Sequence, residues 1–273
     1  MTVIQNGPQL LAGQDPDVAA EILQMFASEE IDVLAPAEIV GVQGRSGASV
    51  RLVVRSSSED KTIQASDILV ATGRAPNTAG IGLELAGVEL DEHGYVKVND
   101  RLETTARNVW AIGESAGSPQ FTHISLDDFR VIRDNLAGGN RSTRDRIVPS
   151  CLFTDPQLAH VGLTETEAKR RGVAVRVAKL PVAAVLRTRT TGETRGFLKA
   201  LIDTNDNHIL GFTMIGPEAG EVMAVVQMAM LAGFPYTVLR DAILTHPTMA
   251  EGLNPLFSSV KQENAPSRRP TKI

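Results

Sequence analysis

The sequence predicts an α/β unit in its first half and a separate α+β unit in its second half. Two apolar runs predict the first unit: residues 67–73 (D-I-L-V-A-T-G) and residues 108–113 (N-V-W-A-I-G) each end in glycine. Continuous apolar runs of this kind are typical of strands buried on both faces of a parallel sheet. The second unit is indicated by a change of character near Asn140, after which short strands and long helices follow a polar linker at 141–146.

Local signals predict the elements that precede the first apolar run. Val3 and Ile4 indicate a strand at the start of the chain, which we interpret as a truncated domain because domains usually begin with a few loose residues. Asp15 is the expected N-cap of a helix, and Pro16 occupies its first turn. The apolar face expected for this helix is Val18, Ile22, Met25 and Phe26, and the strands expected after it are 38–42, 50–54 and 61–65.

The middle of the chain carries a further predicted strand and helix. The strand spans residues 95–98, between the two apolar runs. The helix is expected to begin between Thr122 and Ser125 and to end at Gly138. Its expected apolar face is Phe129, Ile132 and Leu136.

A capping box, several strands and three helices predict the α+β unit. Thr164 and Glu167 form the capping box of a helix that Gly172 ends. Residues 261–273 are polar and contain proline, so we predict a disordered tail. The other expected elements are strands at 151–154, 173–177, 196–203 and 208–215 and helices at 219–232, 236–242 and 249–257.

Composition excludes several classes of protein. The net charge is −5, which gives no reason to expect nucleic acid or a charged membrane surface as a partner. No apolar run reaches the roughly 18 residues of a membrane helix, and the first residues do not form a secretory signal. A single cysteine, Cys151, excludes an intrachain disulfide and fits a cytoplasmic location. We interpret Cys151 as a buried apolar filler, because its sequence neighbours include no clear activating base.

Ligand-binding residues are expected where the two apolar runs end. Ligands of open α/β sheets bind at the carboxyl ends of the strands, and glycine there lets a ligand approach the backbone. Gly73 and Gly113 hold these positions, and Glu114 offers a carboxylate to ligand hydroxyls. Thr122 lies near a helix start, whose N–H groups favour an anionic or electron-rich ligand, and the adjacent His123 is a further candidate. The alternative is a pair of ordinary strand–turn junctions.

The motif at 246–251 (H-P-T-M-A-E) is the most specific local pattern. A carboxylate that orients a histidine raises its basicity, as in acid–base pairs of enzymes. We therefore predict that His246 and Glu251 form a catalytic pair, with a purely structural pair as the alternative. We predict no metal site. The G-I-G at 80–82 is not a dinucleotide fingerprint, because Leu85 occupies the third glycine position and no buried strand immediately precedes it.

Four segments of the chain resemble motifs of the pyridine nucleotide–disulfide oxidoreductase family, which includes dihydrolipoamide dehydrogenase, glutathione reductase and mercuric reductase. Each segment alone is only suggestive, but four in this order at plausible spacing are highly specific. The whole-chain pattern is most similar to mercuric reductase-like members. The segments are 71–77 (A-T-G-R-A-P-N), which resembles the end of the NAD(P) domain, 108–114 (N-V-W-A-I-G-E), the second flavin motif, 153–156 with 161–165, the start of the interface domain, and 246–251, the catalytic histidine–glutamate pair.

The resemblance implies three parts and two cofactors. Residues 1–78 would be the C-terminal part of an NAD(P)-binding Rossmann-like domain, and 79–146 the C-terminal segment of an FAD-binding domain. Residues 147–260 would be an α+β interface, or dimerisation, domain. The implied cofactors are FAD and NAD(P). A homodimer is also implied, because each active site of this family combines residues of two subunits.

The resemblance also implies roles for the residues of the flavin motif. Gly113 and Glu114 would contact the ribityl–pyrophosphate region of the flavin. The family usually has aspartate at position 114, so the longer Glu114 must re-aim or weaken that hydrogen bond. Thr122 would help to place a helix start against the flavin ring, where it would stabilise negative charge on the reduced flavin.

The remaining implied roles concern the nicotinamide nucleotide and the acceptor. Gly73 would line the nicotinamide nucleotide site. Gln5 stands where the family often has an acidic ligand for the adenosine ribose, which leaves NAD versus NADP undecided. His246, oriented by Glu251, would be an acid/base toward a thiol of the partner subunit's redox centre.

Both Gly-rich fingerprints and the redox cysteine pair of this family are absent from the sequence. We therefore expect the chain to be part of a flavoenzyme in which an N-terminal half, or a partner chain, supplies them. The acceptor would be a disulfide, a metal ion such as mercuric ion, or a quinone. The alternative is a non-catalytic dimeric binding module derived from the family.

Overall fold

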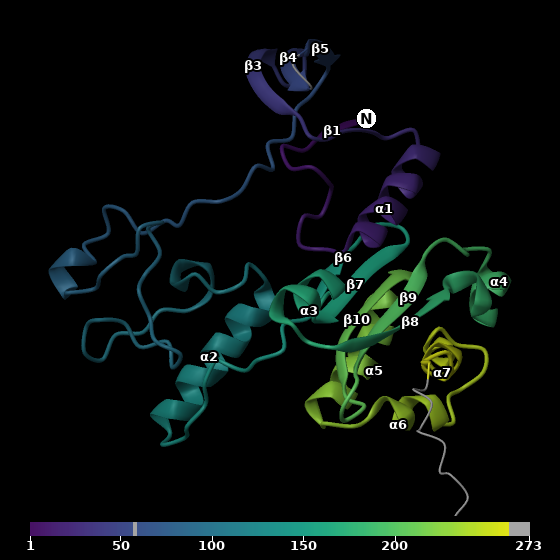
Figure 1. Cartoon of the computed structure of the whole chain (residues 1–273). Coiled ribbons are helices and arrows are strands. Elements are labelled where there is room, and N and C mark those ends of the chain that lie inside the picture. The colour runs from purple at the N-terminus through teal and green to yellow at the C-terminus, as the bar shows by residue number, and fades with distance from the viewer. Residues whose placement is uncertain (57–58, 262–273) are drawn as a thin grey trace, which may run out of the picture. The chain divides into compact units, whose positions relative to one another are not determined.

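The computed structural model describes residues 1–56 and 59–261, which divide into two compact units (Figure 1). Unit 1 comprises residues 1–68 together with the chain from Pro149 onward, and unit 2 comprises residues 69–148. The tail predicted at 261–273 lies outside the described residues except for Lys261.

Unit 1 is built around an antiparallel sheet of five strands in the order β6-β7-β10-β9-β8. The central strands β9 and β10 are buried along nearly their whole length, because helices pack on the sheet. Helix α5 (Ala219–Leu231) packs against β7 and β10, and helix α7 (Leu253–Ser258) packs against β8 and β9. The strands are β6 (Ser150–Leu152), β7 (Gln157–Gly162), β8 (Val175–Pro181), β9 (Phe197–Asp203) and β10 (Ile209–Gly216).

Shorter elements complete this part of unit 1. Helix α3 (Glu165–Arg171) begins with the predicted capping box, in which Oγ1 of Thr164 accepts the N–H of Glu167 at 3.1 Å. Helix α6 (Tyr236–Asp241) and the 3-10 turn η4 (Ala250–Gly252) lead into α7. Helix α4 (Leu186–Thr191), which follows the turn η3 (Val182–Ala184), is not among the elements expected from the sequence. No helix in the described part of the chain is both long and apolar enough to cross a bilayer.

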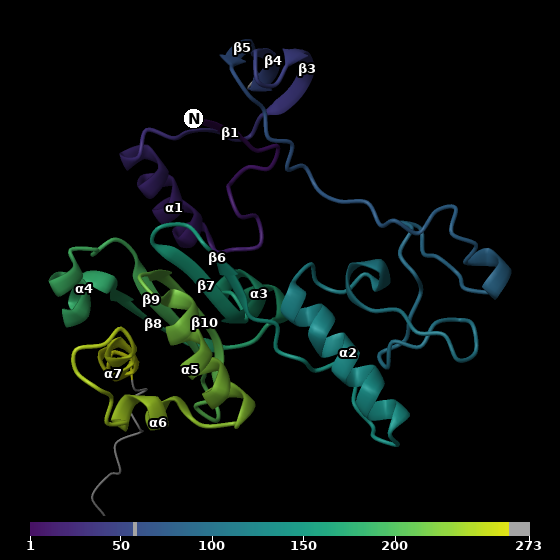
Figure 2. The same cartoon turned by 180° about the vertical axis from the view of Figure 1, so that it is seen from behind.

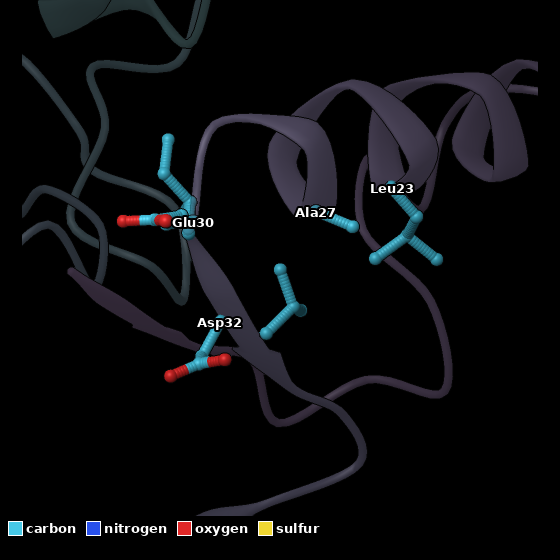
Figure 3. Close-up of a pocket in the computed structure, with 6 residues that line it drawn as sticks. Leu23, Ala27, Glu30 and Asp32 are labelled. Carbon is cyan, nitrogen blue, oxygen red and sulfur yellow. The ribbon is translucent and has the colours of Figure 1, made fainter.

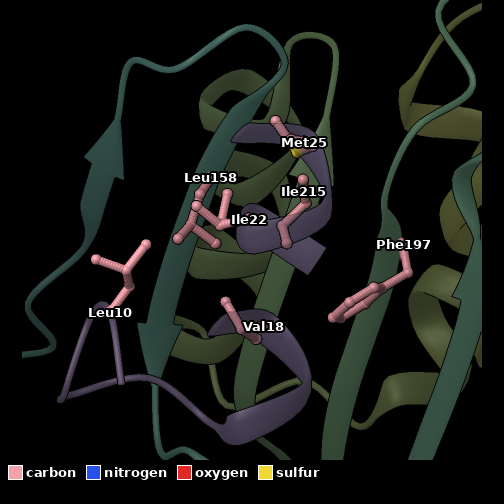
Figure 4. Packing of buried hydrophobic residues seen from close by; sticks show 7 residues of the cluster. All are labelled: Leu10, Val18, Ile22, Met25, Leu158, Phe197 and Ile215. Carbon is pink, nitrogen blue, oxygen red and sulfur yellow. The ribbon is translucent and has the colours of Figure 1, made fainter. Parts of the chain in front are cut away.

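Helix α1 (Pro16–Ser28) packs across this sheet (Figure 4). The predicted apolar face is confirmed, since Val18, Ile22 and Met25 are buried. They form one cluster with Leu158 of β7 and Ile215 of β10. Burying side chains of this size contributes roughly 1.5–3 kcal/mol each, so packing against the sheet rather than helix propensity stabilises α1.

Two small sheets accompany α1 in unit 1. Strand β1 (Thr2–Ile4) pairs in parallel with β2 (Asp32–Leu34), and the two strands form a βαβ unit with α1. The three strands predicted next are confirmed as β3 (Glu38–Arg45), β4 (Ser49–Ser56) and β5 (Glu59–Ala65), an antiparallel sheet with a small core of its own.

A buried lysine joins α1 to the sheet and to α3. Lys199 lies in β9 with its side chain fully buried, and its Nζ is 2.9 Å from Asp15, 2.7 Å from Asp17 and 2.9 Å from Glu165. These three carboxylates would suit a cation, and the ammonium of Lys199 takes that place. Asp15 also accepts the N–H groups of Glu165 and Thr166, the first two residues of α3.

Asp15 is the N-cap residue of α1, as predicted, but its side chain does not cap that helix. Its backbone has the extended conformation of an N-cap, but its carboxylate makes no capping hydrogen bond to α1. The tertiary fold brings a second helix start and an ammonium within reach, and a charged donor forms a stronger hydrogen bond than a neutral one.

Lys199 belongs to a polar row that crosses the sheet. Side chains directly opposite each other on neighbouring strands share a face of the sheet. Across the adjacent strands β7, β10, β9 and β8, these paired positions are His160, Thr213, Lys199 and Lys179 in that order. Nζ of Lys179 is 2.6 Å from Asp17. Nδ1 of His160 is 2.8 Å from Oγ1 of Thr213, and burial lowers the pKa of this histidine, which keeps it neutral at neutral pH.

Acid is expected to weaken this cluster through Asp15. Burial alone would raise the pKa of Asp15, but hydrogen bonds from Lys199, Thr166 and Glu165 outweigh burial and lower that pKa from 3.8 to about 2. Because the folded pKa lies below the unfolded one, Asp15 stabilises the fold fully above pH 3.8, and this contribution is lost as the pH falls toward 2.

Urea denaturation at several pH values measures this loss. The free energy of unfolding should fall less steeply between pH 5 and pH 2 in Asp15→Asn than in the wild type. Glu21→Gln, on the same helix, should keep the wild-type slope. Equal slopes for all three proteins would contradict the assignment.

Unit 2 consists of helix α2 (Thr122–Leu136), the 3-10 turns η1 (Glu84–Ala86) and η2 (Gly113–Ala116), and loops (Figure 2). Between residues 69 and 148 the backbone forms only isolated bridges and no strand. The strands predicted at 67–73, 95–98 and 108–113 are therefore wrong in this structure. A strand buried on both faces needs a neighbouring strand on either side, and this part of the chain supplies none.

Helix α2 begins within the predicted start and ends near Gly138, but it buries a different face. Phe129 and Leu136 are exposed, whereas Ile124, Asp128 and Val131 are buried. The predicted apolar face is wrong because α2 packs on the turn η2 rather than on a sheet.

The first apolar run, at residues 67–73, is expected to bind hydrophobic dyes and to promote aggregation. Leu69 and Val70 are 90% and 71% exposed. We expect the double change Leu69→Lys and Val70→Lys to reduce binding of the dye ANS and to reduce aggregation, with a change in unfolding free energy within about 0.5 kcal/mol. Leu85→Lys, at another exposed leucine, should reduce dye binding less, because Leu85 is not part of an exposed apolar run. A large loss of stability in the double variant would show that the run is packed in solution.

Candidate functional site

A salt bridge links the two glycine-terminated segments within unit 2. Nε of Arg74, next to Gly73, is 2.7 Å from Oε2 of Glu114, next to Gly113. The sequence predicts both glycines and Glu114 as ligand contacts, but Arg74 is not among the predicted residues. Both side chains are partly exposed, so the pair contributes little to stability. Its consequence is geometric, because Arg74 fixes the direction of the Glu114 carboxylate.

Gly113 has a backbone conformation and a packing that favour glycine. Its φ is +64°, and a Cβ at this position would lie 2.6 Å from Oγ of Ser125 on α2. The turn η2 begins at Gly113 and ends before Gly117, which also has a left-handed backbone. This turn therefore lies against α2 while the side chain of Glu114 remains partly exposed.

Thr122 is the first residue of α2, as the sequence predicts for a helix start. The N-cap residue Phe121 makes no side-chain capping hydrogen bond, and the N–H groups and the positive end of the helix dipole at this helix end suit an electron-rich ligand. His123 is the second residue, and its ring stacks on Phe121 with 5.1 Å between ring centroids. The binding roles of Thr122 and His123 remain predictions.

His246 and Glu251 lie together in unit 1. Nδ1 of His246 is 2.8 Å from Oε2 of Glu251, with the imidazole 62% exposed and the carboxylate 17% exposed. Thr248 closes the connecting turn, since its Oγ1 donates to the carbonyl oxygen of Thr245 at 2.7 Å and accepts the N–H of Glu251 at 3.4 Å. With Nδ1 held by the carboxylate, Nε2 is the atom that can exchange a proton with a substrate.

Gln5 continues the parallel pairing beyond β1. Its N–H donates to the carbonyl oxygen of Leu34 at 3.0 Å. A shallow hollow of about 260 Å³ lies beside α1 and β2 in the same unit (Figure 3), but no predicted site residue lines it. The hollow therefore adds no support for a ligand role of Gln5. Its lining residues are Leu23, Ala27, Glu30, Ile31, Asp32 and Val33.

Cys151 is half-buried in β6. Burial, and then the charge of Glu221, raise the pKa of its thiol. Its Sγ is 3.9 Å from the carbonyl oxygen of Leu152. A thiol with a raised pKa is a poor nucleophile, which agrees with the interpretation of Cys151 as a filler.

Three residues with clear structural roles are missing from the sequence prediction. They are Arg74, the partner of Glu114, Asp128 of α2, and Lys199. A signal for Lys199 exists in the sequence, where a single lysine interrupts the apolar strand F-L-K-A-L-I-D at 197–203. A buried charge of this kind requires a partner, but the sequence does not reveal which acidic residues supply it.

Comparison with known proteins identifies the family. The family model described as pyridine nucleotide-disulphide oxidoreductase matches residues 1–128, and the model described as the dimerisation domain of pyridine nucleotide-disulphide oxidoreductase matches residues 148–256. The chain is 40% identical to RclA of Escherichia coli (strain K12), named as a probable pyridine nucleotide-disulfide oxidoreductase, over 96% of this chain and 58% of that protein. It is 37% identical to dihydrolipoyl dehydrogenase of Thermus scotoductus, over 93% and 55% of the two chains.

A mercuric reductase and a solved structure extend the comparison. The mercuric reductase of Lysinibacillus sphaericus is 32% identical, over 93% of this chain and 46% of that protein. The solved structure titled "HOCl-induced flavoprotein disulfide reductase RclA from Escherichia coli" matches with a TM-score of 0.88 at 40% identity, covering 95% of this chain and 59% of that one. The chain thus spans about half the length of the relatives it matches.

The comparisons confirm the fold class and the resemblance predicted from the sequence. The two matched family models follow each other along the chain in the predicted order, with the dimerisation domain second. This chain belongs to the pyridine nucleotide-disulfide oxidoreductase family.

Proposed function

We propose that this chain is part of an FAD-dependent NAD(P)H oxidoreductase that passes electrons from NAD(P)H through FAD to a disulfide, a metal ion or a related acceptor. The His246–Glu251 pair carries the proposal. An exposed imidazole whose Nδ1 is held 2.8 Å from a carboxylate is suited to give a proton to a thiolate or to take one from a thiol. Family membership supports the proposal, and no finding favours the alternative of a non-catalytic module.

The turn and helix start of unit 2 fit one part of a flavin site. Gly113 presents backbone without a side chain, and Glu114 offers acceptor oxygens that Arg74 holds in place. The start of α2 at Thr122 offers the positive end of a helix dipole. Bound FAD would supply electron transfer between the nicotinamide and the acceptor.

We propose that Gly73 of unit 2 lines a nicotinamide nucleotide site, and Gln5 of unit 1 is considered by itself. Gly73 has a left-handed backbone with φ of +119°, and no atom of the described residues lies within 4 Å of a Cβ built there, so a ligand can approach it closely. Gln5 follows β1 and offers a neutral side chain to a ribose. Relative rates with NADH and NADPH decide between the two cofactors.

The names of the relatives support two of the proposed electron acceptors, a metal ion and a disulfide. The relatives include mercuric reductases, and one solved structure is titled as a Cu(II) complex of RclA, which favours a metal ion. The disulfide reductase title of RclA favours a disulfide. A homodimer is proposed from the dimerisation-domain match and from the exposed apolar side chains Met228 and Leu231 on α5.

Completing the protein tests the proposal. The chain is produced together with the N-terminal portion that its longer relatives carry, and the product is purified by gel filtration. We expect the absorption spectrum of bound flavin and flavin-dependent oxidation of NADH or NADPH, with a disulfide or Cu(II) as acceptor. A folded complex that takes up no flavin and oxidises neither nucleotide would overturn the proposal.

A further inference from the structure

A buried ion pair in unit 2 contacts both ends of the turn at 113–118. Asp128 of α2 has no exposed side-chain surface, and its Oδ2 accepts the N–H of Gly113 at 2.7 Å. Its other oxygen, Oδ1, is 2.5 Å from Nη1 of the mostly buried Arg146. Nη2 of Arg146 donates to Oγ of Ser118 at 3.4 Å. One carboxylate and one guanidinium therefore contact the first and the last residue of the turn.

Hydrogen bonds within the turn set its shape but not its position on α2. The N–H of Ser118 donates to the carbonyl oxygen of Gly113 at 3.2 Å, and the N–H of Gly117 donates to the carbonyl oxygen of Glu114 at 3.0 Å. These bonds close the turn on itself. The hydrogen bond from the N–H of Gly113 to Asp128 ties the closed turn to the helix.

The buried N–H of Gly113 needs an acceptor, but that acceptor need not be charged. A neutral acceptor at position 128 would bond this N–H without desolvating a charge, whereas a buried carboxylate is unfavourable unless it is paired. An ionised acceptor bonds a backbone N–H more strongly than a neutral one does. Arg146 offsets the negative charge of Asp128, and it also lies 3.6 Å from Asp127, which in turn pairs with Arg141 at 2.6 Å.

We propose that Asp128 and Arg146 are positioning residues that hold Gly113 and Ser118, so that Glu114 is presented to the flavin in one orientation. The importance of the turn for flavin binding rests on the proposed function. The attachment of the turn to α2 is a property of this chain and is measurable without flavin.

NMR of the isotope-labelled chain without flavin tests the attachment. In Asp128→Ala we expect the Gly113 amide to exchange with solvent about tenfold faster or more, and its proton resonance to move upfield, because its hydrogen bond to a carboxylate is lost. Arg146→Lys keeps the positive charge and should retain most of the protection. Asp134→Asn is the matched control, since Asp134 lies on the same helix and pairs with Arg133 and Arg141 instead.

The outcome at Gly113 decides whether the attachment exists. Equal exchange and equal resonance positions in Asp128→Ala and Asp134→Asn would overturn it. Where Asp128→Ala fails to fold, Asp128→Asn keeps the side-chain volume and one acceptor oxygen. An upfield shift of the Gly113 proton in that folded variant supports the attachment, and an unchanged resonance overturns it.

FAD titration of the protein completed with the N-terminal portion separates this inference from the proposed function. Weaker FAD binding in Asp128→Ala and in Arg146→Met, but not in Asp134→Asn, supports the positioning role. Unchanged FAD binding in both variants overturns the positioning role and leaves the proposed function intact. No FAD binding by the wild type overturns the proposed function, and the positioning role with it, whatever the NMR result.

Discussion

Lys199→Met is expected to lower the free energy of unfolding of unit 1 by about 3–5 kcal/mol. The ammonium is fully buried and lies within 2.9 Å of Asp15, Asp17 and Glu165. Methionine fills a similar volume but leaves the buried Asp15 carboxylate without its cation. Chemical denaturation followed by circular dichroism measures the loss, because most of the helices and strands belong to unit 1.

Lys179→Met is the matched control for this prediction. Lys179 lies opposite Lys199 on the neighbouring strand and contacts Asp17, but its side chain is 42% exposed. An exposed ion pair typically contributes less than about 1 kcal/mol, so we expect a correspondingly small loss. Similar losses of unfolding free energy in the two variants would show that the burial of Lys199 does not increase its contribution to stability. Burial alone would lower the pKa of Lys199, but the hydrogen bonds that its ammonium donates to the three carboxylates raise that pKa, so the ammonium stays charged at neutral pH.

His246→Ala is expected to lower kcat of the completed flavoenzyme about 10²- to 10⁴-fold, the usual contribution of a general acid or base. Reduction of the flavin by NAD(P)H should proceed at its normal rate, because the proposed proton transfer belongs to the reaction with the acceptor. Stopped-flow measurement of the two half-reactions separates these effects. Glu251→Gln should cause a smaller loss, because the amide can still hold Nδ1 of His246 but carries no charge.

His208→Ala is the control for the histidine. Nδ1 of His208 lies 2.8 Å from Asp206, so this pair has the same distance between imidazole and carboxylate as His246 and Glu251 but lies outside the family motif. We expect the activity of His208→Ala to be unchanged. A slowed flavin reduction in His246→Ala, or equal effects of the two alanine variants, would contradict the assigned role.

The sequence by itself determined the elements whose signals are local. The capping box of α3 is confirmed because Thr164 and Glu167 lie within one turn, and their hydrogen bonds depend on that turn alone. The apolar face of α1 follows from helical spacing in the same way. The contact of His246 with Glu251 needs only one short turn between them. The family could also be identified from the sequence, because four short motifs follow one another in a specific order.

Only the tertiary structure decided which distant groups meet. Asp15 and Lys199 are 184 positions apart, and nothing near Asp15 in the sequence indicates that its carboxylate bonds a lysine rather than its own helix. The links from Arg74 to Glu114 and from Asp128 to Gly113 are likewise formed by packing. The apolar run at 67–73 has the composition of a buried strand, yet it forms none here. A strand exists only where neighbouring strands accept its hydrogen bonds, and the chain between residues 69 and 148 offers none.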